Sequence, residues 1–516
     1  GGAALEASCF EIARRYGMRL VGPNCVGIID THLPLDTTFL EPPEPMSGEV
    51  AFISHSGAIC AAVIDWLRGQ GIGLSALVSL GNQVDVNETD VLAYLADDPH
   101  TRVITFYMEG VSDGRRFVDT ARRVTRVKPV IALKVGRFES GRKAAASHTG
   151  ALAGRESAYD AAFLQTGILR ADSTEEMFQW ARALAWCPLP KGPHVAVLTN
   201  AGGPGVTAAD AIEAQGLRLA TLSADTLNAL RPLLPEAASL HNPVDMLASA
   251  SPETYAACLK VLLDDPGVDS AIVIAPPPPM YSAGHIAKST IPIIQSSEKP
   301  VVVAMMGERM IQEAVEHYRA SQIAEYRFPE WAVSALAALY RRTEYLACAE
   351  EEPVRYADIN RAQAEAILKD LPAGGVLSPE AAARLLEVYG IPTTPLRLAQ
   401  SPEQAVELAR EVGFPVVLKI ASPDILHKSD LGGVLVGLQD EAAVRQGYQT
   451  ILARVTAALP AARLEGMHVQ HMIPAGQEVI AGVIRDPQFG PLVMFGSGGI
   501  EVEGLKDVAF GLAPLY

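Results

Sequence analysis

Short apolar runs alternate with segments of helical periodicity along the first two thirds of the chain. This pattern is typical of βαβ units, which build parallel sheets. Residues 50–53 predict a buried strand, residues 54–57 a tight loop and residues 58–67 a helix. Residues 103–107 and 130–134 predict two further buried strands. The fold class that these runs indicate is α/β.

The same series of motifs occurs twice in this region. The first strand and loop, Val50 to Gly57, have a counterpart in Val195 to Gly202. Three more pairs follow in the same order: Asn82 to Val86 with Asn242 to Met246, Asp97 to Pro99 with Asp264 to Pro266, and Lys128 to Ile131 with Lys299 to Val302. Four matches in one order and at similar spacing predict two related doubly wound α/β domains, residues 47–190 and 193–345.

The last third of the chain has a different pattern. A stretch rich in proline and glycine, residues 371–375, precedes it and is a candidate linker. Helices are predicted over 377–389 and 402–411, and strands over 393–398, 415–420, 467–473 and 478–484. This order of elements indicates an α+β domain and not a third copy of the repeat.

Composition narrows the class of function. Acidic residues outnumber basic ones, 59 to 42, and the net charge of −17 disfavours nucleic acid as a partner, because phosphate backbones bind basic surfaces. The six cysteines are scattered without a CxxC pair, which favours reduced thiols over disulfides or a zinc site. No apolar run is long enough to span a bilayer. We therefore expect a cytoplasmic protein without a membrane partner, and homo-oligomer formation stays open.

Two loops place small residues at predicted helix N-termini. Ser56-Gly57 and Gly202-Gly203 each follow the first strand of a repeat. Free backbone N–H groups and the helix dipole favour an anion at such a position. One loop of this kind alone is more simply interpreted as a tight turn between strand and helix. The pair raises the alternative that both helices point at one shared phosphate.

His148 is the main candidate for chemistry. It lies in a loop of small residues, Ser147 to Gly154, which offers little core for a buried side chain. A neutral imidazole in such a loop can attack phosphorus and form a covalent intermediate, which divides one difficult transfer into two steps. Glu109 follows the strand 103–107 and is expected at the carboxyl edge of the same sheet, where a carboxylate can fix the tautomer of the imidazole. A purely structural turn remains the alternative.

The last third carries two further candidates. Lys419 lies in an apolar predicted strand, and it is either an edge lysine with its ammonium group in solvent or a contact for nucleotide phosphate. His427 lies in the polar loop Pro423 to Gly433, and such loops are often functional. A histidine in a surface loop is nevertheless more often without a function.

Together these motifs resemble the nucleoside-diphosphate-forming acyl-CoA synthetases, relatives of succinyl-CoA synthetase. The resemblance implies two tandem flavodoxin-like domains at 47–190 and 193–345, a linker at 346–375 and an ATP-grasp domain at 376–516. Residues 1–46 resemble the end of a Rossmann-like CoA-binding domain, with the motif Gly22 to Gly27. Within that motif the resemblance implies Asn24 and Cys25 as contacts for CoA.

The resemblance also implies roles for the candidate residues. His148 matches the phosphoryl carrier of the family's phosphohistidine loop, and Glu109 matches the carboxylate that supports it. His427 matches a second phosphoryl carrier, and Lys419 the nucleotide lysine. The other matches are the two helix starts that hold the phosphate and a segment of the ATP-grasp domain: Ser56, Gly57, Gly202, Gly203 and Glu478.

The activity implied by the resemblance is that of an acid–thiol ligase. A carboxylic acid, CoA and ATP give acyl-CoA, ADP and phosphate by way of an acyl phosphate and a phosphohistidine, with Mg²⁺ beside the nucleotide. The alternative is a ligand-sensing scaffold of a protein acetyltransferase. Members of that kind tend to lose the phosphorylatable histidine, so His148 favours the ligase. The acyl substrate, the nucleotide preference and the metal ligands are not readable from the sequence.

Both ends of the sequence look cut. The chain starts without methionine, and the glycine-rich start of the CoA-binding domain is expected upstream of Gly1. The asparagine-and-aspartate stretch that binds the metal in the family is expected beyond Tyr516. On this interpretation the 516 residues alone should give no measurable acyl-CoA synthesis, while phosphate or sulfate is still able to occupy the pocket near His148.

Overall fold

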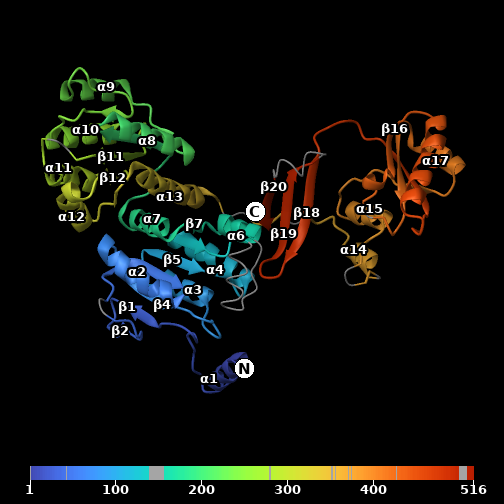
Figure 1. Cartoon of the computed structure of the whole chain (residues 1–516), viewed down its shortest axis with the longest axis horizontal. Helices are drawn as coiled ribbons and strands as arrows, with labels where there is room; N and C mark the ends of the chain where they lie inside the picture. Colours follow the sequence, from blue (N-terminus) through green and yellow to red (C-terminus); the bar gives the residue numbers. More distant parts are fainter. Residues whose placement is uncertain are drawn as a thin grey trace. The chain divides into compact units, whose positions relative to one another are not determined.

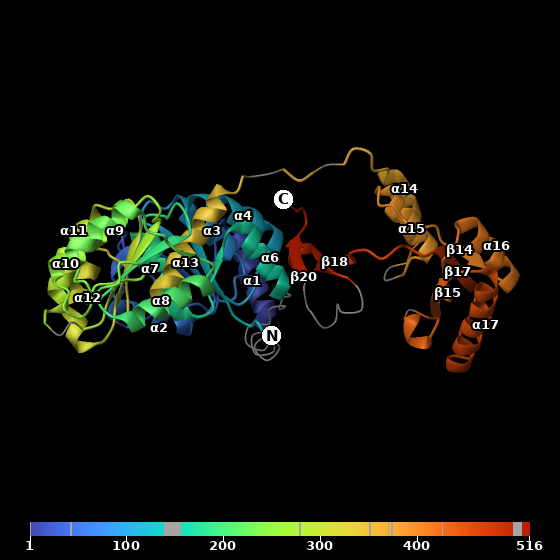
Figure 2. The ribbon, with the colours of Figure 1, turned by 90° about the horizontal axis from the view of Figure 1, so that it is seen from above.

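The computed structural model of the chain forms two compact units, residues 1–351 with 479–515, and residues 352–478. Figure 1 and Figure 2 label the helices and strands within them. The structure describes these ranges of the chain: 2–41, 44–138, 156–277, 280–349, 352–354, 356–369, 371–372, 375–425, 427–498 and 508–515.

The first unit contains a seven-stranded sheet in the order β2-β1-β4-β3-β5-β6-β7. Its parallel strands are β3 (Ser47–Ser54), β4 (Leu74–Ser79), β5 (Val103–Met108), β6 (Val130–Lys134) and β7 (Leu169–Arg170). β1 (Ile28–Asp30) and β2 (Leu35–Asp36) extend the sheet antiparallel beyond β4. The parallel order 4-3-5-6-7 is flavodoxin-like and reverses direction between β3 and β5, where ligands bind in such sheets.

Helices cover both faces of this sheet. One face carries α2 (Gly57–Gln70) and α7 (Thr174–Trp186); the other carries α3 (Glu88–Asp97), α4 (Gly114–Val127) and α6 (Glu156–Thr166). Side chains of a strand alternate between faces. Val50 and Phe52 of β3 accordingly belong to the core under α2 and α7, and Ala51 and Ile53 to the core under the other helices. The predicted buried strands and the helix after residue 57 are confirmed.

A second parallel sheet follows in the order β10-β8-β11-β12-β13, with β9 beside β8. Its strands are β8 (His194–Thr199), β9 (Arg218–Leu219), β10 (Val244–Asp245), β11 (Ser270–Ala275), β12 (Val301–Met305) and β13 (Glu325–Tyr326). Its helices are α8 (Gly202–Ala214), α9 (Ala224–Leu230), α10 (Pro252–Asp264), α11 (Ala283–Gln295), α12 (Gln312–Ala320) and α13 (Pro329–Ala347). The strand order repeats that of the first sheet.

The predicted internal repeat is visible in matching hydrogen bonds. Ser54 Oγ bonds both the N–H and the C=O of Ser56, and Thr199 Oγ1 does the same with Ala201. The Lys128 ammonium group donates to the backbone carbonyl of Asp98. In the second copy, Lys299 Nζ donates to the equivalent carbonyl of Asp265 at 2.7 Å. The two domains are therefore related in their turns as well as in their strand order.

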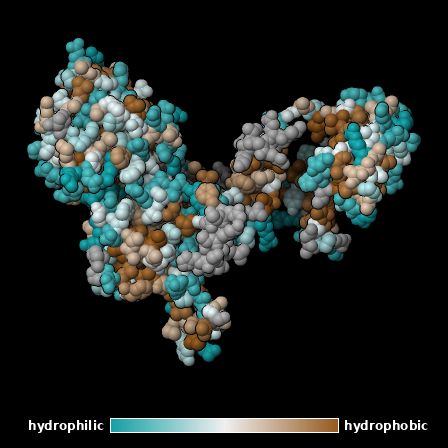
Figure 3. All heavy atoms as spheres, in the orientation of Figure 1, coloured by the Kyte–Doolittle hydropathy of each residue, from teal (hydrophilic) through white to brown (hydrophobic). Residues whose placement is uncertain are grey.

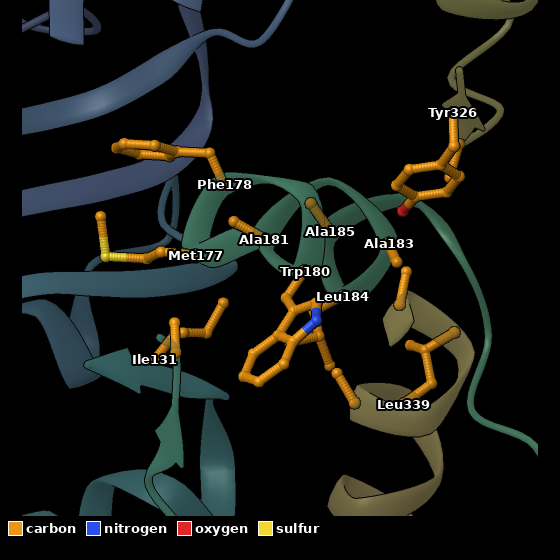
Figure 4. Close-up of a cluster of buried hydrophobic side chains, with 14 of the residues drawn as sticks. Ile131, Met177, Phe178, Trp180, Ala181, Ala183, Leu184, Ala185, Tyr326 and Leu339 are labelled. Carbon is orange, nitrogen blue, oxygen red and sulfur yellow. The ribbon is translucent and has the colours of Figure 1, made fainter. Parts of the chain in front are cut away.

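The two flavodoxin-like domains share one hydrophobic core. Figure 4 shows α7 between the first sheet and α13, with Trp180 and Phe178 among the buried side chains. Trp180 Nε1 donates to Ser334 Oγ of α13 at 2.9 Å. The buried guanidinium of Arg182 lies 2.9 Å from Glu325 Oε1 in the second domain. Because a buried charge requires a partner, Arg182 is paired with its described acidic partner only when the two domains pack together.

The second unit is an α+β domain. Its antiparallel sheet has the order β14-β17-β15-β16, made of β14 (Arg397–Ala399), β15 (Val416–Ala421), β16 (Val434–Leu438) and β17 (Gly466–His471). Its helices are α14 (Arg361–Leu368), α15 (Pro379–Val388), α16 (Pro402–Val412) and α17 (Glu441–Ala458). The strand predicted over 393–398 is wrong for its first part, because Pro395 has no N–H to donate to a sheet.

A separate antiparallel sheet consists of β18 (Val479–Asp486), β19 (Gly490–Ser497) and β20 (Val508–Leu512). Although it lies far along the sequence, it belongs to the first compact unit. At the other end of the chain, α1 (Gly2–Arg15) buries only Ala13, and it leaves Leu5 and Ile12 exposed. Apolar atoms are accordingly visible on this helix in Figure 3.

Candidate functional site

The two predicted phosphate-binding helix starts have the same construction. α2 begins after Ser56 and α8 after Ala201, and among the described residues neither N-cap side chain caps its helix. Two neighbouring helices differ, since Asn87 and Asp113 cap α3 and α4 through their side chains. Backbone N–H groups at the starts of α2 and α8 thus have no side-chain cap competing with an anion.

The predicted CoA contacts lie close to the start of α2. A Cβ on Gly57 would lie 2.6 Å from Cγ2 of Val26, so only glycine allows this approach. The Val26 N–H donates to Ser79 Oγ at 3.0 Å, which holds the loop against the end of β4. Asn24 and Cys25 directly precede Val26 and are exposed and partly exposed, respectively. The fold therefore brings the predicted CoA motif against the start of α2, the first predicted phosphate-binding helix.

His55 is a site residue that the sequence analysis missed. It lies at the end of β3, is 8% exposed, and its Nδ1 accepts the backbone N–H of Glu109 at 3.1 Å. The backbone N–H of His55 donates to the carbonyl of Tyr107. Because Nδ1 accepts, the single proton of the neutral ring is on Nε2. His55 thereby links the end of β3 to the end of β5, where Glu109 lies.

Burial determines the charge of this histidine. Loss of hydration, together with the positive charge of Lys134, lowers the pKa of His55 from 6.5 to about 4. The ring is therefore neutral at physiological pH. The signal that could have found it is the repeat itself, because Asn200 occupies the equivalent place in the second domain. If the two loops were only tight turns, neither would require a polar side chain at the positions of His55 and Asn200.

Three buried polar atoms at these strand ends have no hydrogen-bond partner among the described residues. They are Nε2 of His55, Oε2 of Glu109 and Oδ1 of Asn200. Buried polar groups are almost always paired, so unpaired ones indicate where further polar atoms belong. Two of the three lie at the point where the first sheet reverses its strand order, as expected for a ligand site in this fold.

His148 lies outside the described residues, within 139–155. The described residues on either side of that range form an ion-pair network. Arg137 Nε lies 3.2 Å from Glu156 Oε1, and Arg170 also pairs with Glu156. β6 ends at Lys134, which pairs in register with Met108 of β5. β6, the last described strand before that range, therefore ends at the same sheet edge as β5, the strand that Glu109 follows.

The nucleotide candidates lie in the second unit. β15 lies between β17 and β16, so the interpretation of Lys419 as an edge lysine in solvent is wrong. Lys419 is half-buried, and its Nζ donates to Gln470 Oε1 at 2.9 Å. Burial and the nearby charge of Lys428 lower the pKa of Lys419. Lys419, whose described hydrogen-bond partner is a neutral amide, and the neighbouring cation Lys428 together fit an anionic ligand.

His427 and Glu478 are both exposed. His427 lies in the loop between β15 and β16, as predicted, and Glu478 directly precedes β18. Within the described ranges, no hydrogen bond or ion pair joins Lys419, His427 and Glu478. The second helix start, Gly202-Gly203, is exposed, with Asp245 Oδ2 3.4 Å from the Cβ position of Gly202.

Replacing His55 by asparagine should change how stability depends on pH. The unfolded chain binds a proton at His55 near pH 6.5, whereas the folded chain binds it only near pH 4. Folding is therefore weakened as pH falls through this window, by roughly 3 kcal/mol for this group. His55→Asn, which copies Asn200, should lose that part of the pH dependence. Urea unfolding of both proteins between pH 7 and 4.5 measures the free energy of unfolding. If this free energy changed with pH equally in His55→Asn and in the unsubstituted protein, the buried neutral ring would be contradicted.

The described residues were compared with the requirements of a metal site and of a membrane-spanning helix. Among the residues that the structure describes, no group of three or more His, Cys, Asp or Glu side chains is placed to hold a metal ion. None of the described helices combines the length and apolar character that crossing a membrane requires. None of the six cysteines forms a disulfide in this structure.

Three family models match the chain. A succinyl-CoA ligase like flavodoxin domain matches residues 47–184, a Ligase-CoA domain matches 195–348, and an ATP-grasp domain matches 371–516. These matches agree with the fold class that the sequence predicts.

The alignments with two similar proteins extend over the whole chain. Acetate--CoA ligase [ADP-forming] I of Archaeoglobus fulgidus is 42% identical over 515 residues, which is 100% of this chain and 74% of that protein. The 4-hydroxybutyrate--CoA ligase [ADP-forming] of Nitrosopumilus maritimus is 36% identical, with the same shares covered. A solved structure of the Ca. Korarchaeum cryptofilum dinucleotide forming acetyl-coenzyme A synthetase 1 with phosphate and ADP is 38% identical. Its TM-score is 0.65, over 68% of this chain and 77% of that one. The chain belongs to the family of ADP-forming acyl-CoA ligases.

Proposed function

We propose that the protein makes acyl-CoA from a small carboxylic acid, CoA and ATP, with His148 as the phosphoryl carrier. The observation that carries the proposal is the convergence at the edge between β3 and β5. The uncapped start of α2, the CoA motif against Gly57, and the unpaired atoms of His55 and Glu109 all lie there. This set of hydrogen-bond donors and acceptors suits a phosphoryl group with the thioester of acyl-CoA nearby.

The reaction divides into balanced steps. His148 attacks the transferred phosphorus, and a nitrogen–phosphorus bond forms as the bond to the donor oxygen breaks. A carboxylate oxygen of the acid then takes the phosphoryl group and frees the imidazole. The thiolate of CoA attacks the carbonyl carbon of this acyl phosphate, and inorganic phosphate leaves. His427 carries the phosphoryl group between the nucleotide and His148.

The chain's own groups have distinct roles in these steps. N–H groups at the starts of α2 and α8 stabilise the phosphoryl oxygens, because they are oriented before the reaction and need no rearrangement. Glu109 accepts a hydrogen bond from a ring N–H of His148 and so fixes the tautomer of the imidazole. The N–H of His55 Nε2 adds one neutral donor at the same edge. Asn24 and Cys25 contact CoA, and Glu478 contacts the nucleotide.

Mg²⁺ is expected with the nucleotide from the resemblance alone. The described residues offer no cluster of carboxylates and histidines to hold it, and we assign no residue and no step to it. The free thiols support a reducing compartment such as the cytoplasm. A ligand-sensing acetyltransferase scaffold is not favoured, because the relatives that match the whole chain are named as ligases.

A panel of acids tests the proposed function. Each acid is given to the full-length protein with ATP, CoA and Mg²⁺, and ADP and phosphate release are followed. Acetate and 4-hydroxybutyrate belong in the panel, because two relatives are named for them. We expect release that needs both the acid and CoA. If acyl-CoA bound tightly while no acid supported release, a sensing role would be the better explanation.

Replacing Lys419 by methionine should weaken nucleotide binding. The substitution removes a half-buried cation next to Lys428 but keeps the apolar stem in β15. The loss of a charged hydrogen bond of this kind corresponds to roughly a 10- to 100-fold weaker affinity. Calorimetry with ADP measures the change. Lys260→Met, which removes an exposed lysine of α10, is the matched control and should bind ADP normally. Equal affinity in both variants would remove Lys419 from the nucleotide site.

A further inference from the structure

Two arginines hold the end of α2, the first predicted phosphate-binding helix. Arg319, in α12 of the second domain, donates from Nη1 to the carbonyl of Gly69 at 2.8 Å. Arg182, in α7, donates from Nη2 to the carbonyl of Gln70 at 3.0 Å. The last carbonyls of a helix have no partner within it and carry the negative end of its dipole, so guanidinium groups suit them. The second domain thus helps to fix a helix whose start belongs to the candidate site.

One buried carboxylate joins these arginines into a group, the arginine cluster, which consists of Arg182, Arg319 and Glu325. Glu325 Oε1 lies 2.8 Å from Nε of Arg319 and 2.9 Å from Nη1 of Arg182. Two guanidinium groups share one carboxylate, so the cluster keeps an excess positive charge. Nε of Arg182 is buried and has no hydrogen-bond partner among the described residues. An unpaired buried donor next to an excess positive charge indicates where an anion belongs.

A cavity of about 430 Å³ lies beside the arginine cluster, and all three residues of the cluster line it. Its walls come from both flavodoxin-like domains. Tyr326 of β13 is one of them: its hydroxyl donates to the carbonyl of Gln179 in α7 at 3.0 Å, and Figure 4 shows its ring beside that helix. None of the described residues that line the cavity belongs to the candidate site. Its size, roughly within the 300 to 1,000 Å³ of small-molecule pockets, and its place between two domains are typical of a binding site.

The interior of the cavity is positive, and part of its wall is aromatic. Three further charged residues line it, Glu175, Glu308 and Arg327, and all three are exposed. Water and salt screen exposed charges, so the arginine cluster sets the charge inside. Trp66 of α2 and Trp331 of α13 also line the cavity and are partly buried, which gives it flat apolar surfaces. The cavity therefore combines an excess positive charge with aromatic walls.

We propose that this cavity, the arginine cavity, binds a small organic anion. A carboxylate or phosphate group of the ligand lies against Arg182 and Arg319, because planar guanidinium groups bind both anions through paired hydrogen bonds. A planar part of the same molecule packs against Trp66 and Trp331. The binding itself is independent of the proposed function.

The arginine cavity is connected to the candidate site through α2. The guanidinium groups that receive the anion also hold the end of this helix, whose start donates to the phosphoryl group in the proposed mechanism. A ligand that takes up their N–H groups loosens α2. The consequence, which rests on the proposed function, is that an anion in the cavity lowers acid-dependent phosphate release.

Calorimetry on the full-length protein without ATP and CoA tests the binding. The probes are benzoate and phenyl phosphate, and acetate and inorganic phosphate carry the same anionic groups without the ring. We expect saturable binding of at least one ring compound, about 10-fold or more tighter than its ring-free counterpart, because the ring is buried against tryptophan. The ring compound that binds more tightly identifies the anionic group. Arg319→Met should weaken this binding about 10- to 100-fold through the loss of charged hydrogen bonds. Arg231→Met, at an exposed arginine outside the cavity, is the matched control.

A second variant keeps both arginines and so separates binding from stability. Gln312→Trp, at an exposed position of α12 that lines the cavity, fills the space and should also weaken binding at least about 10-fold, with the urea unfolding midpoint unchanged. The proposal would be overturned if neither ring compound bound, or if each bound no more tightly than its ring-free counterpart. Equal affinity in Arg319→Met, Gln312→Trp and Arg231→Met would overturn it as well. Calorimetry reports binding even if the ligase assay fails.

Discussion

Replacing His148 by asparagine should abolish acyl-CoA synthesis, lowering turnover by roughly four orders of magnitude or more. The imidazole forms the bond to phosphorus in the proposed mechanism, and an amide cannot replace it as a nucleophile. Removal of a covalent nucleophile from a cooperating group of residues has effects of about this size. Acid-dependent phosphate release by the full-length variant measures the loss.

A matched control separates chemistry from folding. His285→Asn changes an exposed histidine of α11, and it should retain full turnover. The unfolding midpoint of His148→Asn should stay close to that of the unsubstituted protein. If His148→Asn kept a tenth or more of the turnover, His148 would not be the phosphoryl carrier.

Replacing His427 by alanine should separate the two half-reactions. His427 is exposed in a polar loop of the second unit, where its side chain contributes little to packing. We expect phosphoryl exchange between ATP and the protein to fall at least about 100-fold, as for other groups that carry a transferred proton or phosphoryl group. Labelling of His148 from acyl-CoA and phosphate should stay within twofold.

The second half-reaction is an internal control for His427→Ala, because the same preparation performs both. Radiolabelled ATP measures the nucleotide side, and radiolabelled phosphate with acyl-CoA measures the acyl side. An equal loss on both sides would assign His427 to structure or binding. Loss on the acyl side alone would reverse the proposed order of carriers.

Sequence patterns predicted the strands and the internal repeat well, because these features depend on residues that are close together in the chain. The strands at 50–53, 103–107 and 130–134 are apolar except for Thr105 and Lys134, so short apolar runs alone identify them. The repeat predicted that two domains share one strand order, and the matching bonds of Lys128 and Lys299 follow from it. The strand predicted over 393–398 starts only at Arg397, because Pro395 lacks the N–H that a sheet requires.

Contacts between distant segments were beyond the reach of sequence patterns. Nothing local to Gly57 indicates that Val26 packs on it, and nothing in β18–β20 indicates that Phe489 packs against Gly114. The burial and tautomer of His55 depend on the backbone of Glu109, which lies 54 residues away in the chain. Lys419 could be placed on a strand, but its central position depends on the order in which the strands pair.

The phosphoryl group itself tests the central claim most directly. The full-length protein is incubated with acyl-CoA and radiolabelled phosphate, digested at neutral pH, and its peptides are mapped by mass spectrometry. We expect phosphate on His148 that forms only when both compounds are present and that is lost, by way of His427, when ADP is added and ATP appears. Turnover without phosphate on the His148 peptide, or with stable phosphate on a residue other than His148 and His427, would contradict the account.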